Sequence, residues 1–94
     1  MLGDRYDIED LRYLMQRLRD PQDGCPWDIK QTAKTVVPYT LEEVYELVDA
    51  LEYGDDKSVR DELGDVLFQV VFYAQLGREQ GIYDFDDVVQ GIVE

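Results

Sequence analysis

The chain has 94 residues, of which 22 are acidic and 9 are basic, and its formal net charge is -13. A chain of this length predicts one domain that buries only a modest share of its surface by itself, which leaves room for a partner subunit. A charge of this sign excludes nucleic acid and anionic membranes as partners, and a phosphate-bearing substrate fits only if divalent cations lie between its phosphates and the carboxylates.

Two residue types limit the chemistry and the location of the protein. The sequence has no histidine, so it lacks the usual general base and the main zinc ligand. Its single cysteine, Cys25, has no partner for an internal disulfide, which fits a reducing cytoplasm. Residues 1–10 are acidic and lack the apolar run of a secretory signal, and no stretch is long enough to span a membrane. We therefore expect a cytoplasmic protein.

The first predicted helix covers residues 7–19. Its apolar residues recur at helical spacing, with Asp7 as the N-cap, and they are Ile8, Leu11, Leu14, Met15 and Leu18. The segment that follows, PQDGCPWDIKQT, contains two prolines and a glycine within six residues, which predicts a loop. This loop carries Trp27, the only tryptophan of the chain.

Three more helices follow the loop. The second helix ends near Tyr53, with Gly54 as its C′ residue, and it begins either at the N-cap Thr40 or at an earlier turn before Pro38. The third helix covers residues 57–80 and ends at Gly81, and the fourth begins after Asp84. The predicted fold class is all-α, a four-helix, bundle-like single domain over residues 1–94. Because the fourth helix reaches residue 94 without a stop signal, we expect this domain to be truncated at its C-terminus.

The second and third helices both carry acidic pairs beside apolar residues. Glu43 and Glu46 lie about 60° apart on the second helix, at the edge of its apolar stripe. The third helix is apolar around most of its circumference, which predicts that it is buried. A narrow polar line made by Glu62, Asp65 and Gln69 interrupts this apolar surface.

The short GDDKS connection predicts that these two helices pack antiparallel, so that their acidic pairs face each other. Two carboxylates roughly 6 Å apart repel by about 3 kcal/mol at an effective dielectric of about 20. Solvent, protonation or a divalent metal ion would relieve this repulsion, and a set of oxygen ligands suits Mg²⁺ or Mn²⁺. The alternative is a set of structural ion pairs with Lys57, Arg60 or Arg12.

The same acidic residues carry a family resemblance. EExxE followed by ExxD, here Glu42, Glu43, Glu46, Glu62 and Asp65, resembles the pattern of the all-α nucleoside triphosphate pyrophosphohydrolases. Three longer blocks resemble the MazG family itself, in particular its N-terminal domain. They are MQRLRDPQDGCPWD, PYTLEEVYELVDAL and DELGDVLFQVVFYAQ.

The resemblance implies a homodimer or higher homo-oligomer that binds Mg²⁺ and hydrolyses nucleoside triphosphates between the α- and β-phosphates. Such an activity removes surplus or non-standard nucleotides from the pool. By motif position, the metal ligands are Glu43, Glu46, Glu62 and Asp65. Glu42 is the candidate for orienting or deprotonating the attacking water, and Glu43 is assigned to catalysis as well as to the metal.

Two further residues are candidate contacts to the nucleotide. Trp27 could border a base pocket by stacking, or it could cap the bundle. Lys30 could contact phosphates, or it could be a solvated surface lysine. The competing function is a non-catalytic dimerisation or scaffold domain that retains the acidic motif.

Overall fold

The computed structural model describes residues 5–94, and within them the chain is all-α, as predicted. Five helices are present instead of four, because Pro26–Ile29 forms a short helix inside the predicted loop. Proline fits the first turn of a helix, where its missing N–H leaves no bond unmade. The helices are α1 Ile8–Leu18, α2 Pro26–Ile29, α3 Ala33–Tyr53, α4 Asp56–Glu79 and α5 Phe85–Val93.

Acidic caps set the starts of three helices. Asp7 and Asp10 form a reciprocal capping box at the start of α1, and Asp84 and Asp87 form another at the start of α5. The side chain of Asp55 accepts a hydrogen bond from the backbone N–H of Ser58 at the start of α4. The predicted caps Asp7 and Asp84 are therefore confirmed.

The earlier of the two predicted starts for α3 is the observed one. Thr32 caps the helix together with Thr35, and Pro38 lies inside its second turn. The proline removes only one backbone hydrogen bond there, the bond to the carbonyl of Lys34. Thr40, the alternative cap, is an interior residue of α3, and its hydroxyl takes part in contacts with α4.

The glycines that end α3 and α4 act in different ways. Gly81 has φ +72°, and the N–H groups of Gly81 and Ile82 bond the carbonyls of Arg78 and Gly77, so α4 ends in a Schellman motif. Gly54 is the C-cap of α3 with φ -92°, so it needs no left-handed conformation. A larger residue does not fit at position 54, because its Cβ would lie 2.8 Å from the carbonyl oxygen of Ala50.

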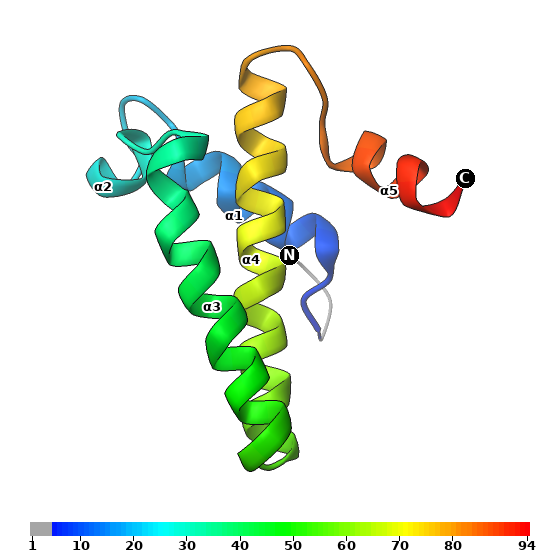
Figure 1. Ribbon diagram of the computed structural model, residues 1–94. Coiled ribbons are helices and arrows are strands. Elements are labelled where there is room, and N and C mark those ends of the chain that lie inside the picture. Colours follow the sequence, from blue (N-terminus) through cyan, green and yellow to red (C-terminus); the bar gives the residue numbers. More distant parts are fainter. Residues whose placement is uncertain (1–4) are drawn as a thin grey trace.

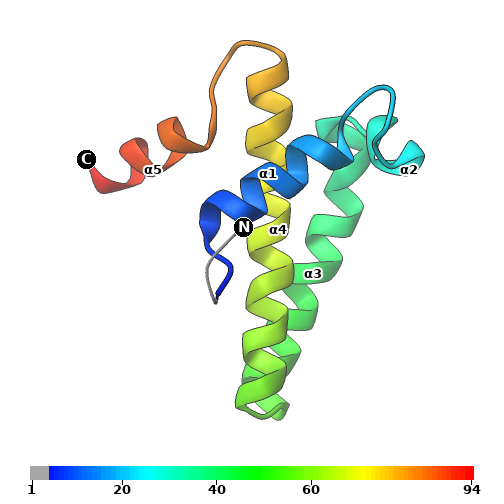
Figure 2. The same cartoon turned by 180° about the vertical axis from the view of Figure 1, so that it is seen from behind.

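The helices α3 and α4 form an antiparallel pair, and α1 crosses one face of that pair near the C-terminal half of α4 (Figures 1 and 2). The opposite face of the pair has no helix over it, and α5 extends away from the body. Arg12 of α1 reaches α5 through an ion pair with Asp86, 3.1 Å long, and lies over the ring of Phe85.

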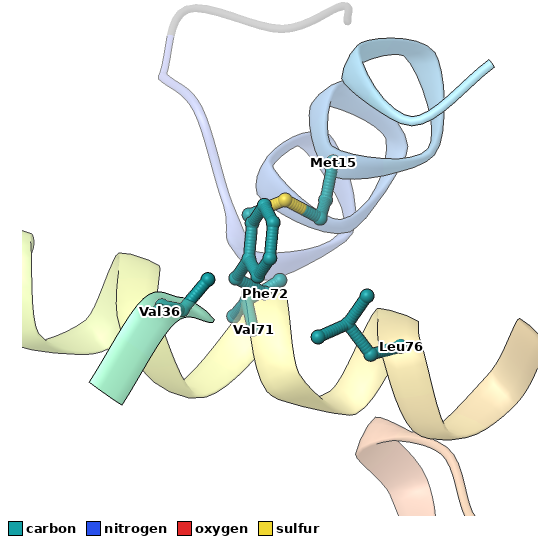
Figure 3. Close-up of a cluster of buried hydrophobic side chains, with 5 residues drawn as sticks. All are labelled: Met15, Val36, Val71, Phe72 and Leu76. Carbon is teal, nitrogen blue, oxygen red and sulfur yellow. The ribbon is translucent and has the colours of Figure 1, made fainter. Parts of the chain in front are cut away.

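The core lies where α1 meets the α3–α4 pair. Met15 reaches from α1 toward Phe72 of α4, and the neighbouring apolar side chains close around them (Figure 3). The buried cluster consists of Met15, Val36, Val71, Phe72 and Leu76. Each of these side chains is at most 4% exposed.

The prediction that the α4 segment is buried nearly all round is wrong for the single chain. Leu63, Leu67 and Val70 of α4 are 40–52% exposed. The reason is that α1 covers only one side and one end of the pair. Four residues of the predicted apolar stripe on α3 are exposed as well, at 41–62%, and they are Leu41, Val44, Val48 and Leu51. None of the helices in residues 5–94 combines the length and hydrophobicity needed to cross a bilayer.

Candidate metal centre

Four carboxylates meet between α3 and α4. Each of the four residues offers one oxygen atom, and these atoms all lie within 4.8 Å of one another. The antiparallel packing of the two helices brings them together, because Glu43 and Glu46 are one turn apart on α3, and Glu62 and Asp65 are one turn apart on α4. The set is Glu43, Glu46, Glu62 and Asp65, hereafter the acidic cluster.

The cluster has a shielded side and an open side. Glu43 and Glu62 are half-buried, and the Oε2 atom of each is shielded from solvent without a hydrogen-bond partner. Glu46 and Asp65 are exposed. Shielded carboxylate oxygens without partners are costly, and a cation bound beside these two atoms would offset that cost.

Burial and mutual repulsion within the acidic cluster also make the ionised carboxylates unfavourable. The pKa of Glu43 is raised, first by burial and then by repulsion from Glu46 and Asp65. The pKa of Glu62 is raised by burial and by the same two neighbours. Both shifts disfavour the ionised form, and a positive charge placed among these oxygens would reverse them.

The basic residues proposed as alternative partners pair elsewhere. Lys57 and Arg60 both contact Asp61, at 3.0 and 3.6 Å. Arg12 pairs with Glu9 and Asp86. No ion pair within the described part of the chain neutralises the acidic cluster. An oxygen-only ligand set with an open side fits a hard divalent cation that keeps some of its waters, such as Mg²⁺ or Mn²⁺.

A hydrogen-bonded group of three uncharged side chains lies one turn from the cluster. The Thr40 hydroxyl is 2.7 Å from Gln69 Oε1 and 2.7 Å from the Tyr73 hydroxyl. Thr40 donates to Gln69, so Tyr73 is left to donate to Thr40. Thr40 lies three residues before Glu43, and Gln69 lies four after Asp65, so these bonds fix the register of the two helices beside the cluster. These contacts give Gln69 a role in packing α3 against α4.

This group was not predicted, because a threonine at position 40 is also a competent helix cap. The signal available was spacing, since Gln69 and Tyr73 continue the polar line of Glu62 and Asp65 at helical intervals. That line indicates a polar partner on α3, but only the packing identifies Thr40 as the partner.

The other predicted site residues lie outside the acidic cluster. Glu42 is exposed and lines a shallow groove on α3 together with Tyr45 and Asp49. Trp27 is 50% exposed, and its ring meets the ring of Tyr39 edge-on, with centroids 5.4 Å apart. Lys30 is exposed at the end of α2. The structure therefore brings the four predicted metal ligands together and leaves these three residues outside the cluster.

The structure thus defines the class of the protein as an all-α domain that gathers four carboxylates between two antiparallel helices. The MazG nucleotide pyrophosphohydrolase domain matches residues 31–94, which include both acidic helices. The chain therefore belongs to the MazG family, as the sequence motifs indicated.

Proteins of several bacteria are similar to this chain. The nucleoside triphosphate pyrophosphohydrolase of Escherichia coli K12 is 56% identical over 85 residues, which are 90% of this chain and 32% of that protein. The nucleoside triphosphate pyrophosphohydrolase/pyrophosphatase MazG of Thermotoga maritima is 46% identical over 87 residues, 93% of this chain and 34% of that protein. The chain thus spans about a third of the length of these relatives.

Proposed function

We propose that this chain is a MazG-like domain that hydrolyses nucleoside triphosphates between the α- and β-phosphates, giving the nucleoside monophosphate and pyrophosphate. The observation that carries the proposal is the acidic cluster, with its two shielded and unpartnered oxygen atoms. Membership of the MazG family and the names of the relatives support the same reaction. The proposed cellular role is the removal of surplus or non-standard nucleotides from the cytoplasmic pool.

The acidic cluster is proposed to hold Mg²⁺, with Mn²⁺ as the alternative ion. A bound divalent cation would neutralise triphosphate charge and polarise the phosphoryl group. Glu43 and Glu62 hold the shielded side of the site, and Glu46 and Asp65 border the side that is open to substrate and water.

Glu42 is proposed to orient or deprotonate the attacking water. Its neighbour Glu43 lies in the cluster, whereas Glu42 lines the adjoining groove, which also includes Glu46. The proposal therefore requires a water held between the cluster and this groove. Asp49 lines the same groove and is a second acidic group within it.

Trp27 and Lys30 are proposed to contact the nucleotide. Tyr39, which the Trp27 ring meets edge-on, lies four residues before Glu43, so the aromatic pair lies on the same side of α3, roughly 6 Å along the helix from that carboxylate. An exposed aromatic surface at this distance suits a nucleobase whose phosphates reach the cluster. Lys30 follows α2 directly and is exposed for contact with a phosphate.

A second copy of the chain is proposed to cover the apolar face that α1 leaves open, so that the protein is a homodimer or a larger homo-oligomer. The exposed apolar residues recur every three or four positions on both helices. With the acidic pairs turned toward each other, both stripes face the side of the α3–α4 pair away from α1. The uncovered face consists of Leu41, Val44, Val48, Leu51, Leu63, Leu67 and Val70.

Pyrophosphate release tests the proposed reaction. The protein is incubated with Mg²⁺ and the common ribo- and deoxyribonucleoside triphosphates, and pyrophosphate is measured. We expect release by the wild type and a loss of about a hundredfold or more in Glu43→Gln and in Asp65→Asn, because each removes a ligand from the cluster. Asp61→Asn is the matched control, since this carboxylate lies on α4 but pairs with Lys57. Release that survives both cluster substitutions would contradict the site.

The uncovered apolar face also supports a second candidate function, a dimerisation or scaffold domain of a larger protein that retains the acidic cluster without turnover. The same assay separates the two functions. Absence of pyrophosphate from a wild-type chain that associates with itself and binds Mg²⁺ would favour the scaffold.

A further inference from the structure

The short helix α2 is held in place without a core of its own. None of its four residues is buried, and Trp27 within it is half exposed. Ile29 is only partly buried, so burial of apolar surface by itself gives this helix a limited anchor. Its position depends on directed contacts from neighbouring elements.

Arg19, the C-cap residue of α1, supplies most of these contacts. Its side chain is only 11% exposed. The Nη1 atom lies 2.5 to 3.0 Å from three backbone carbonyl oxygens at the end of α2, those of Asp28, Ile29 and Gln31. These carbonyls are at the C-terminus of a helix, where a cation and a hydrogen-bond donor are both favourable.

The other side of the same guanidinium is anchored to α4. Its Nε and Nη2 atoms donate to the two carboxylate oxygens of Glu79, at 3.0 and 2.6 Å, in a bidentate ion pair. The guanidinium also lies 5.7 Å from the centre of the Phe72 ring in the core. Burial opposes ionisation of Glu79, but hydrogen bonds from Arg19 and Gln75 hold its pKa below the ordinary value. Arg19 thus ties α2 to the end of α4 by one planar group.

We propose that Arg19 is a positioning residue: it fixes α2 so that Trp27 stays against Tyr39, and it thereby sets the affinity of the site for the nucleoside part of the substrate. The inference deepens the proposed function and rests on it. Without Arg19, α2 keeps its edge contact to Tyr39 and the bond from the Gln31 side chain to the Trp27 carbonyl. Neither of these contacts reaches α4.

The chain contains its own probe for this proposal, because Trp27 is the only tryptophan. The informative variants are Arg19→Lys, whose single ammonium group cannot bond Glu79 and three carbonyls at once, and Glu79→Gln, which retains the carbonyl bonds. Quenching of tryptophan fluorescence by acrylamide measures how well α2 is held. Circular dichroism at the same temperature checks that each variant is folded.

Arg12→Lys is the matched control. Arg12 is also an arginine of α1 with a side chain only 17% exposed, and it also combines an ion pair with a ring contact, but it ties α1 to α5. Its loss should leave both the quenching of Trp27 and the hydrolysis of nucleotides unchanged. A general loosening of the domain would affect the two arginine variants alike.

For Arg19→Lys we expect stronger quenching of Trp27 and a KM for the triphosphate raised about tenfold, with kcat within twofold of the wild type. For Glu79→Gln we expect the same changes at smaller size. Unchanged quenching in a folded Arg19→Lys variant would overturn the proposal, and so would stronger quenching with an unchanged KM. If the wild type releases no pyrophosphate, the proposed function fails, but the inference about Arg19 can still be tested. The Kd for ATP with Mg²⁺ is then measured in place of the KM. A Kd that Arg19→Lys leaves unchanged would overturn the inference.

Discussion

The two faces of the α3–α4 pair are similar in composition but differ in cover. On the face that α1 crosses, Val36, Phe72 and Leu76 are at most 4% exposed. On the opposite face, Val44, Val48 and Leu63 are 41–52% exposed. Both sets are large apolar side chains on the same two helices. The apolar pattern of a helix therefore predicts which residues favour burial, but it does not predict which element buries them.

Burial of the uncovered apolar face on association would stabilise this protein further. Burying one leucine or valine side chain fully contributes about 1.5–3 kcal/mol, and several side chains on this face are about half exposed. A domain of this size gains only a small net stability from its own core. Association through this face would therefore raise the free energy of unfolding.

The largest expected effect separates the two faces directly. Leu76→Ala and Leu63→Ala are the same substitution on the same helix, at positions 4% and 52% exposed. In dilute monomer we expect Leu76→Ala to lower the free energy of unfolding by about 2.7–5 kcal/mol because it leaves a cavity. Leu63→Ala should lower it by less than about 1 kcal/mol. Urea denaturation, followed by circular dichroism, measures both values.

The same pair of variants tests the proposed second copy. At higher protein concentration, Leu63→Ala should weaken association in sedimentation analysis, and Leu76→Ala should affect it only by unfolding the chain. A wild-type chain that sediments as a monomer at every concentration would rule out self-association through the uncovered face.

A smaller effect is expected where α3 and α4 meet beside the acidic cluster. Thr40→Val removes a hydroxyl that bonds Gln69 and Tyr73, and it leaves two partly buried polar groups without this partner. We expect a loss of about 1–2 kcal/mol in the free energy of unfolding. Thr40→Ser keeps the hydroxyl and serves as the control. Equal stability of the valine variant and the wild type would show that water replaces these bonds at no cost.

The smallest effect concerns the acidic cluster without metal. Because the pKa of Glu43 is raised in the folded chain, its ionised form destabilises the fold at neutral pH. Glu43→Gln removes this repulsion, and we expect the metal-free melting temperature to rise by roughly 4 °C, a gain limited by solvent on the open side of the cluster. Glu52→Gln, an exposed position on α3, controls for the general loss of negative charge.

The pH dependence of this gain follows from the sign of the shift. Above the raised pKa, Glu43 is ionised in both states and the penalty on the folded chain is complete. As the pH falls through the raised pKa toward the ordinary value of 4.5, the folded chain takes up the proton first, so the gain from Glu43→Gln shrinks. Below that value both states are protonated and the gain disappears. A gain that stays constant from pH 4 to pH 8 would contradict this account.

Magnesium should make the wild type more stable than Glu43→Gln, the reverse of the order expected without metal. A ligand that binds only the folded state stabilises it by about 2.7 kcal/mol at one hundred times its Kd. We therefore expect millimolar Mg²⁺ to raise the melting temperature of the wild type by more than that of Glu43→Gln. No change in the wild type over this range would contradict the proposed magnesium site.

The sequence was sufficient for most of the helices and for the four carboxylates that meet. Asp7, Asp84 and Gly81 predicted helix ends correctly, because capping depends on local backbone bonds. The ExxE and ExxD spacings predicted the acidic cluster, because residues three apart share one side of a helix. The start of α3 stayed open, since Thr32 and Thr40 are both competent caps by local criteria.

Local patterns by themselves thus determined an all-α chain, the boundaries of α1 and α4, the end of α3 and the start of α5 to within a few residues, and the spacing that places each acidic pair on one side of its helix. Only the tertiary structure decided that Thr40 bonds Gln69 and Tyr73, that Arg19 joins α2 to α4, and that one apolar face is left uncovered. The physical reason is distance along the chain. Caps and helix faces are set by bonds over three or four residues, whereas these contacts depend on how whole helices pack, which no short stretch of sequence specifies.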